Sequence, residues 1–338
     1  MTDHTWGVLS NQAITAAGVV YFLALLCALV EWSAWQSRAR AAVAEKELVG
    51  AGAPADETDA PAPSKTASAA DAVREQRAAL FGRLSLLLTA IAVVCHLIAL
   101  VGRGMAADPN RVPWGNMYEF TISGSFVVAA AYVVLHRRLK LSWMAPWVLG
   151  FTIVVLTLAV VGLYEPVAPL TEALNSYWLV IHVIAAIIAT GGFTLGGIAS
   201  AAYLLKSRFP DAALLARVPD LDNLDRVSYR IHAFAFPVWT FGVLISGPIW
   251  AHEAWGSYWN WDPKEVWAFI TWVVYAGYLH ARATAGWKGK KAAIVALIGL
   301  ATLWFNFIGI NYFSSTSQHS YAAPAAPAVV ELTEGASR

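Results

Sequence analysis

Apolar stretches long enough to cross a bilayer recur along the chain and alternate with short polar segments. A spanning helix needs about 20 consecutive apolar residues, and at that length only a helix satisfies its own backbone in lipid. The pattern predicts an all-α integral membrane protein with about eight transmembrane helices. The expected spans are residues 12–35, 80–101, 119–135, 141–163, 177–205, 231–251, 264–283 and 292–313.

The polar segments divide the chain into four expected parts. Residues 1–35 contain the first transmembrane helix, and residues 79–321 form a seven-helix domain. Between them, residues 36–78 are rich in Ala, Pro and charge, a composition that predicts a disordered cytoplasmic linker. The Ala/Pro-rich residues 322–338 are expected to form a mobile extracytoplasmic tail.

Composition and charge support this assignment. The chain is 58% hydrophobic and 13% charged, whereas a soluble domain carries about 25% charged residues. Of its 23 Lys and Arg residues, 19 fall in segments that share one side of the predicted topology. Positive residues mark the cytoplasm, so both termini are expected on the extracytoplasmic side of a multi-pass plasma-membrane protein. The lipid bilayer is the expected environment, no nucleic-acid partner is expected, and no phosphate-binding loop motif occurs.

The segment WGSYWNWDPKEVW, residues 255–267, combines four tryptophans with three charged residues. One interpretation is structural, since tryptophans collect at membrane interfaces. Asp262 is then the N-cap of the next helix, Pro263 its first residue and Glu265 the partner in a capping box. This interpretation explains how the helix begins, but it leaves the density of tryptophan unexplained.

A second interpretation is a platform for a planar aromatic ligand. Eight of the 16 tryptophans fall between residues 239 and 287, whereas an interfacial belt distributes them over many helices. Stacking on indole and burial both favour a large conjugated ring. The expected platform residues are Trp250, Trp255, Trp259 and Trp261, with Asp262 at their edge.

Several histidines are candidate iron ligands for such a ring. His182 and His319 are expected at similar depth on the outer side, flanking the tryptophan loop, and His252 is a competitor for either role. His280 is expected near the cytoplasmic end of its span, where an ionisable group suggests function. His96 lies nearer the outer end of the second span, so His96 and His280 differ in depth by about 15 Å and do not suit one iron.

Residues 250–282, WAHEAWGSYWNWDPKEVWAFITWVVYAGYLHAR, resemble the tryptophan-rich WWD domain of the haem-handling proteins of cytochrome c maturation. Within that superfamily the chain is similar to the CcsA/ResC type of the two-component System II synthetase. The supporting stretches are PWGNMYEF (113–120), NSYWLVIHV (175–183), LDNLDRVSYR (221–230) and FNFIGINYFSSTSQHSY (305–321).

The resemblance implies that residues 79–321 are a haem-handling domain with the WWD loop at 250–267. Such proteins carry haem b from the cytoplasmic side to the outer face. There, with a ResB/CcsB-type partner, they present it to the CxxCH motif of apocytochrome c, and a thioredoxin-like protein keeps the thiols reduced. By motif match, His182 and His319 correspond to the outer axial ligands and His280 to an intramembrane haem ligand. His96 matches a recurrent histidine of the second span.

Three rival interpretations are a System I-type WWD haem-delivery protein, a haem b electron-transfer subunit, and a transporter for another aromatic solute. An electron-transfer subunit usually holds haem inside its bundle, whereas the best-matched histidine pair here is expected at the outer surface. The sequence offers no candidate nucleophile or proton-transfer pair whose geometry can be defended. The expected role is therefore positioning, as the haem-binding subunit of a cytochrome c haem lyase.

Overall fold

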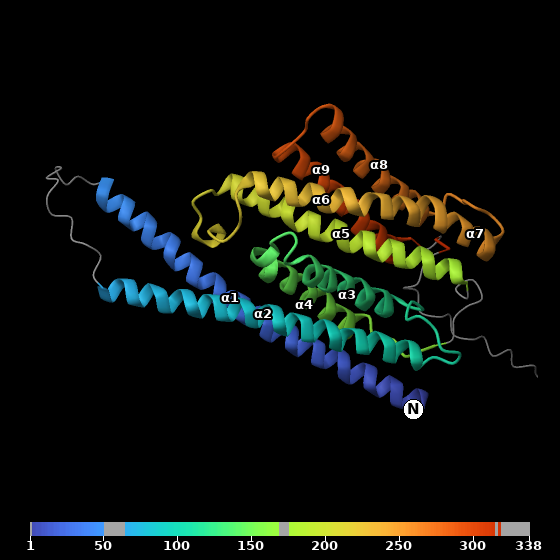
Figure 1. The fold of residues 1–338 in the computed structure, drawn as a ribbon. Coiled ribbons are helices and arrows are strands. Elements are labelled where there is room, and N and C mark those ends of the chain that lie inside the picture. Colours follow the sequence, from blue (N-terminus) through green and yellow to red (C-terminus); the bar gives the residue numbers. More distant parts are fainter. Residues whose placement is uncertain (1, 51–64, 169–175, 315–316, 319–338) are drawn as a thin grey trace, which may run out of the picture.

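The structure is a computed structural model, and it describes the chain apart from residues 1, 51–64, 169–175, 315–316 and 319–338. All regular elements in the described part are helical, and most run side by side as one elongated bundle (Figure 1). The longer helices are α1 (Asp3–Gly50), α2 (Lys65–Met105), α3 (Met117–Leu135), α4 (Ala145–Gly162), α5 (Tyr177–Arg208), α6 (Leu221–Thr240), α7 (Gly247–Trp255), α8 (Pro263–Thr284) and α9 (Lys290–Trp304). Two short 3₁₀ turns are η1 (Leu141–Met144) and η3 (Ala213–Leu215). Two π-helical turns are η4 (Phe241–Ser246) and η5 (Phe305–Gly309), and the short helix α10 (Ile310–Phe313) follows η5.

The predicted linker requires a correction, because helix continues into it from both sides. Helix α1 extends to Gly50 and α2 begins at Lys65, so residues 36–50 and 65–78 are helical rather than disordered. Both stretches are rich in Ala, Glu, Lys and Arg, which are strong helix formers. Only residues 51–64 of the expected linker lie outside the described part, as does the expected mobile tail.

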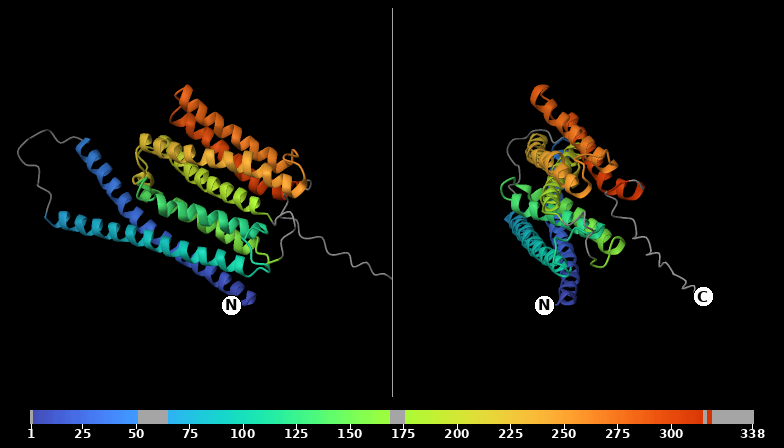
Figure 2. Two further views of the ribbon diagram at one scale, coloured as in Figure 1. Left: turned by 45° about the vertical axis from the view of Figure 1, so that its right-hand side comes forward. Right: turned by 90° about the vertical axis from the view of Figure 1, so that its right-hand side faces the viewer.

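Within the described residues, seven helices are long and apolar enough to cross a membrane. They include seven of the eight expected spans. The eighth, residues 264–283, corresponds to α8, which is less apolar because it holds several Trp and Tyr residues and carries charges near both ends. Helix α8 packs along α9 in the same bundle (Figure 2).

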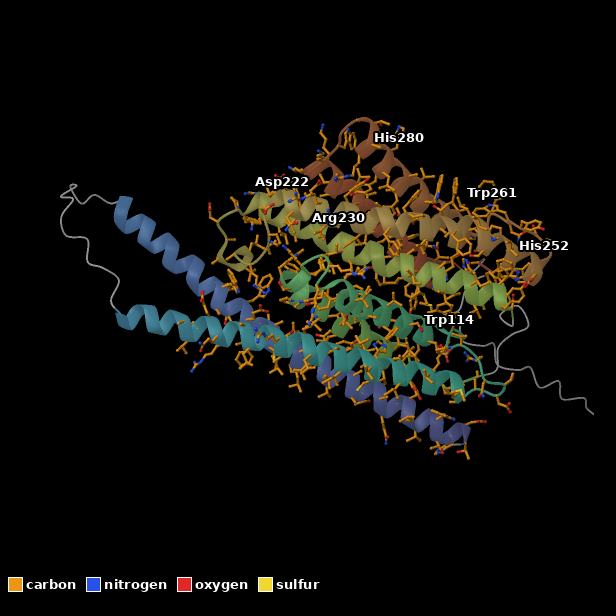
Figure 3. All side chains as sticks on the ribbon, viewed as in Figure 1. Trp114, Asp222, Arg230, His252, Trp261 and His280 are labelled. Atoms are coloured by element: carbon orange, nitrogen blue, oxygen red, sulfur yellow. The ribbon has the colours of Figure 1, made fainter. Side chains whose placement is uncertain are left out.

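The two ends of the bundle differ in the residues they carry. Trp114, His252 and Trp261 lie at one end, which is also where α1 begins and α7 ends (Figure 3). Asp222 and Arg230 lie toward the opposite end. We refer to the first as the tryptophan end.

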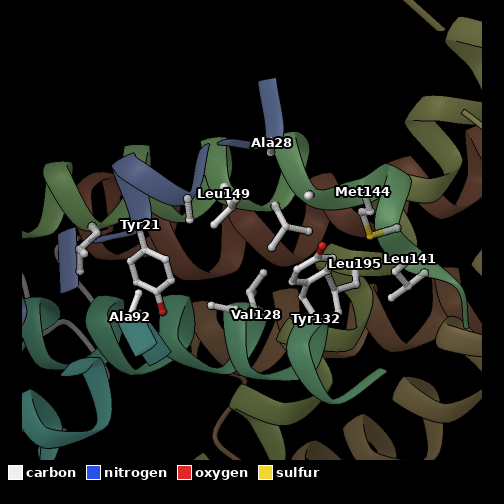
Figure 4. Close-up of a cluster of buried hydrophobic side chains, with 14 of the residues drawn as sticks. Tyr21, Ala28, Ala92, Val128, Tyr132, Leu141, Met144, Leu149 and Leu195 are labelled. Atoms are coloured by element: carbon white, nitrogen blue, oxygen red, sulfur yellow. The ribbon is translucent and has the colours of Figure 1, made fainter. Parts of the chain in front are cut away.

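The core consists of helices in close contact through small side chains. Tyr21 and Tyr132 are buried among alanines, leucines and valines of α1–α5 (Figure 4). Glycines in the GGFTLGG segment of α5, residues 191–197, let neighbouring helices approach closely. A Cβ atom at Gly191 would lie 2.9 Å from Val127 of α3, and one at Gly197 would lie 2.5 Å from Leu300 of α9. Such contacts fix the positions of α3 and α9 around α5.

Candidate functional site

Asp262 begins α8 as the sequence predicts. Its side chain accepts a hydrogen bond from the backbone of Lys264 at 3.0 Å, and Glu265 accepts one from the backbone of Asp262 at 3.1 Å. Pro263 is the first helical residue, which completes the predicted capping box. Glu265 also accepts from the backbone of Asn260 at 2.9 Å, so the same carboxylate holds the preceding loop.

Asp262 also binds the segment that precedes His319. The hydroxyl of Ser317 donates to Asp262 Oδ2 at 2.8 Å, and the backbone N–H of Gln318 donates to Asp262 Oδ1 at 2.7 Å. Asp262 is 5% exposed, so these bonds are shielded from water. His319 itself lies outside the described residues. Its neighbour in the chain is nevertheless attached directly to the tryptophan loop.

A large cavity opens at the tryptophan end and extends into the bundle between α3, α5 and α9. Its volume is about 1400 Å³, including the part open to the surroundings. Along α5 its wall runs from Leu179 to Thr190, a depth of about 16 Å. Most of the wall is apolar. The polar side chains in it include those of Thr121, Ser125, His182, Thr190, Tyr258, Trp259, Lys264, Glu265 and Asn306.

His182 is held in the cavity wall by the carbonyl of Gly242, which lies 2.8 Å from its Nδ1. A carbonyl only accepts, so Nδ1 carries the proton and the ring's lone pair is on Nε2. Such a second hydrogen bond commonly fixes the orientation of a metal-binding imidazole. The ring also stacks on Trp250, with centroids 5.8 Å apart and planes 14° apart. The cavity wall therefore contains an oriented imidazole backed by indole.

The backbone conformation at Gly242 explains how its carbonyl comes within hydrogen-bonding distance of the His182 ring. Gly242 lies in the π-helical turn η4, where its carbonyl accepts the backbone N–H of Gly247. Turns of this type are rare and occur often at functional sites. A Cβ atom on Gly242 would lie 3.3 Å from the Cβ of Ala185, so the absent side chain lets η4 approach α5 closely. Gly242 could not be predicted from the sequence, because a π-helical turn has no simple sequence signature.

The four predicted platform tryptophans have different positions. Trp250 is buried and lines the cavity, and Trp259 also lines it. Trp255 does not line the cavity but packs edge-on against Trp250, with ring centroids 4.8 Å apart. Trp261 is 73% exposed, has a backbone φ of 56° and is not part of the cavity wall (Figure 3). The cavity thus uses two of the four indoles directly.

The other candidate histidines lie elsewhere. His280 is exposed on α8 at a distance from the tryptophan end (Figure 3). His96 is fully buried on α2, where its ring makes edge contacts with Tyr21 and Phe126. His252 stacks on Tyr258 at 4.3 Å and is exposed. The structure thus places His182 alone, of the described candidate histidines, in the cavity wall.

Most polar side chains of the cavity wall were not predicted from the sequence as ligand contacts, among them Lys264 and Asn306. Lys264 is directed to Asn311, with its Nζ 3.0 Å from Oδ1. Asn306 is carried by the π-helical turn η5, and its buried Oδ1 has no hydrogen-bond partner among the described residues. The buried indole Nε1 of Trp259 is likewise unpartnered there. Leaving such groups unpaired costs about 1–3 kcal/mol each, which indicates a site for a ligand with polar groups.

The donor set fits haem better than a bare metal ion. Among the described residues no three His, Cys, Asp or Glu side chains come together as they would around a metal ion. Haem needs only one or two axial ligands from the protein and otherwise an apolar, aromatic surrounding. His182, Trp250 and Trp259 in the cavity wall meet that requirement.

Comparisons with known proteins point to cytochrome c biogenesis. The profile of the family described as Cytochrome C assembly protein matches residues 114–317. "Cytochrome c biogenesis protein CcsA" of Guillardia theta is 32% identical over 251 residues, covering 68% of this chain and 83% of that protein. The protein of that description from Microcystis aeruginosa is also 32% identical, covering 69% and 85%.

Two other matches cover less of the related protein. The CcsA protein of Chlamydomonas reinhardtii is 43% identical over 157 residues, which are 46% of this chain and 44% of that protein. Among solved structures, "Cytochrome c Heme Lyase CcmF" has a TM-score of 0.60, with 14% sequence identity, over 91% of this chain and 47% of that chain. This structural likeness shows a shared fold.

Proposed function

Because this chain belongs to the Cytochrome C assembly protein family and is of the CcsA type, we propose that it binds haem and presents it for attachment to apocytochrome c. The observation that carries the proposal is the His182 imidazole, which the Gly242 carbonyl orients in the wall of a tryptophan-lined cavity. Haem is the cargo rather than a resident cofactor. It supplies the vinyl groups, and the cysteines of the CxxCH motif supply the thiols.

The chain's own contribution is to position the haem and to shield it from water. His182 would provide one axial nitrogen, and Trp250 and Trp259 would pack against the ring. We propose His319 as the second axial ligand, because Asp262 anchors the two residues before it at the tryptophan loop. Attachment then requires one protein histidine to give way to the histidine of CxxCH. The protein would act as the haem-binding subunit of a haem lyase.

The membrane arrangement that fits this role has eight spans, because α8 crosses the plasma membrane in addition to the seven more apolar helices. The tryptophan end then faces the extracytoplasmic side. The support is the concentration of Lys and Arg in segments expected on the other side. A ResB/CcsB-type protein would be the membrane partner, and a thioredoxin-like protein would keep the apocytochrome thiols reduced. Since α8 exposes His280, we propose that His280 binds haem at an intramembrane site on the way to the cavity. We also propose His96, which is buried between α1, α2 and α3, as a haem-binding residue.

The test is an absorption spectrum of the purified protein, coexpressed with its partner. We expect a haem b spectrum in the wild type that weakens or shifts in the His182→Ala/His319→Ala double variant. His252→Ala is the matched control, because His252 also lies at the tryptophan end but outside the cavity wall. Equal haem content and identical spectra in all three proteins would contradict the proposal. A wild type that never contains haem would favour the solute transporter.

The proposed route has a separate test. If haem passes His280 before it reaches the cavity, His280→Ala should lower the haem content at the outer site while leaving the spectrum of the remaining haem unchanged. Normal loading of the outer site in this variant would separate the two sites and remove His280 from the route.

A further inference from the structure

A second hollow lies beside the cavity, on the membrane-facing side of the bundle between α2, α3 and α5, and Ile187 of α5 lines both. Its volume is about 940 Å³, including the part open to the surroundings, and its wall is almost entirely apolar. The rim is open to lipid, because Val101, Ile184 and Ile188 are 50%, 46% and 38% exposed. We call this hollow the α2–α5 groove.

The α2–α5 groove fits within one leaflet of a bilayer. It begins at residues 111–114, beside the first residues of α3, and its wall on that helix extends to Val127. From Glu119, which accepts a hydrogen bond from Arg111, to Val127 the helix rises about 12 Å, which lies within one half of a hydrocarbon layer about 30 Å thick. The apolar part therefore matches an acyl chain of the leaflet at the tryptophan end.

A buried cluster of charges lies at the outer end of the α2–α5 groove. The carboxylate of Glu119 accepts hydrogen bonds from Arg103 Nε at 2.8 Å, Arg111 Nη1 at 2.7 Å and the backbone of Gly115 at 2.7 Å. The side chains of Arg103, Arg111 and Glu119 are 3%, 8% and 0% exposed. Two guanidinium groups therefore share one carboxylate, which leaves one positive charge in excess.

Arg111 rather than Arg103 faces the groove. The Nη1 and Nη2 atoms of Arg111 also donate to Glu119 and to the backbone carbonyls of Val112 and Ala168. The Arg103 guanidinium also lies over the rings of Tyr118 and Tyr164, at 5.1 and 5.7 Å, which stabilise a cation. Arg111 lines the groove, and its buried Nε has no hydrogen-bond partner among the described residues.

No second carboxylate in the described part of the chain pairs with this cluster. Asp108 and Glu165 are exposed in the neighbouring loops, and neither forms an ion pair with an arginine there. A guanidinium cannot release its proton, and a buried charge without a partner is costly. A counter-anion from outside the chain would balance it.

We propose that the α2–α5 groove binds one anionic phospholipid of the outer leaflet, with an acyl chain along the apolar wall and the phosphate at Arg111. The lipid would complete the charge cluster that joins α2, α3 and the loop around Glu165, whose backbone carbonyl accepts a hydrogen bond from Arg103. Ile187 lies in the walls of both the groove and the proposed haem cavity, whereas the proposed haem ligand His182 lines the cavity alone.

The test is native mass spectrometry of the delipidated full chain in detergent, titrated with phosphatidylglycerol or phosphatidylcholine. We expect one phosphatidylglycerol to bind about tenfold more tightly than phosphatidylcholine. Both lipids offer a phosphate, but choline also brings a positive charge next to the arginine cluster, where like charges repel. Ile188→Trp and Val101→Trp each fill the groove from its lipid-exposed rim, and either should remove this binding. Ile298→Trp is the matched control, since Ile298 is 50% exposed on α9, outside the groove.

Equal affinity for the two lipids would overturn the proposal, as would unchanged phosphatidylglycerol binding in both groove-filling variants. The excess charge would then be balanced within the chain. Glu172, which lies outside the described residues, would be the candidate for that role.

Discussion

Asp262→Asn tests how the tryptophan loop is joined to the segment that carries His319. The Asp262 carboxylate caps α8 and accepts hydrogen bonds from Ser317 and from the backbone of Gln318. Asparagine is as good an N-cap as aspartate, so α8 should begin normally in the variant. The variant loses the negative charge, however, and one of its two acceptor atoms becomes a donor.

The magnitude follows from the two bonds that are affected. A hydrogen bond to a charged group contributes about 1.5–3 kcal/mol, and a neutral one about 0.5–1.5 kcal/mol. For two bonds, the attachment of residues 317–318 should weaken by roughly 2–3 kcal/mol. That corresponds to an increase of about 30- to 150-fold in the fraction of molecules with the segment detached.

Two measurements on the purified protein check this expectation. Proteolytic cleavage after residue 314 should accelerate, because cleavage follows the population of the open form. If His319 is an axial ligand, the haem spectrum should change in the same variant. Asp220→Asn is the matched control, since Asp220 caps α6 through the backbone of Asn223 at 2.8 Å, away from the C-terminal segment. Equal cleavage rates in the two variants would refute the reasoning.

Three further predictions concern stability. Gly196→Ala should lower the unfolding temperature, because the added Cβ would lie 2.4 Å from the buried ring of His232. Overpacking of this kind costs about 1–3 kcal/mol. Gly124→Ala is the control, because a Cβ at Gly124 would meet open space. Glu119→Gln should destabilise by about 3–5 kcal/mol in a thermal unfolding assay, since it leaves buried guanidinium groups without their carboxylate. Burial, and then neighbouring arginines, lower the pKa of His136 below its usual 6.5. Stability should therefore fall as the pH drops below about 6.5, and His136→Gln should flatten that part of the profile.

The helical membrane fold could be predicted from the sequence because lipid leaves the backbone few alternatives. Apolar length identified the spans, and the Asp262-Pro263-Lys264-Glu265 order identified the start of α8, because capping is a local interaction. Composition was a poorer guide for residues 36–50 and 65–78, which are helical. The Pro and charged residues in the middle of the segment led to a prediction of disorder that also included its helix-forming flanks.

The contacts between distant segments depend on the tertiary structure. Asp262 and Ser317 are 55 residues apart, and the His182 imidazole meets the Gly242 carbonyl across 60 residues. Periodicity and motif spacing describe neighbours along one helix, so they identified His182 and Asp262 as candidates without their partners. The same limit applies to Trp261, whose left-handed backbone directs it away from the cavity despite its place among the four tryptophans. Which side chains of a motif share a cavity depends on how helices pack, and that packing is a property of the whole chain.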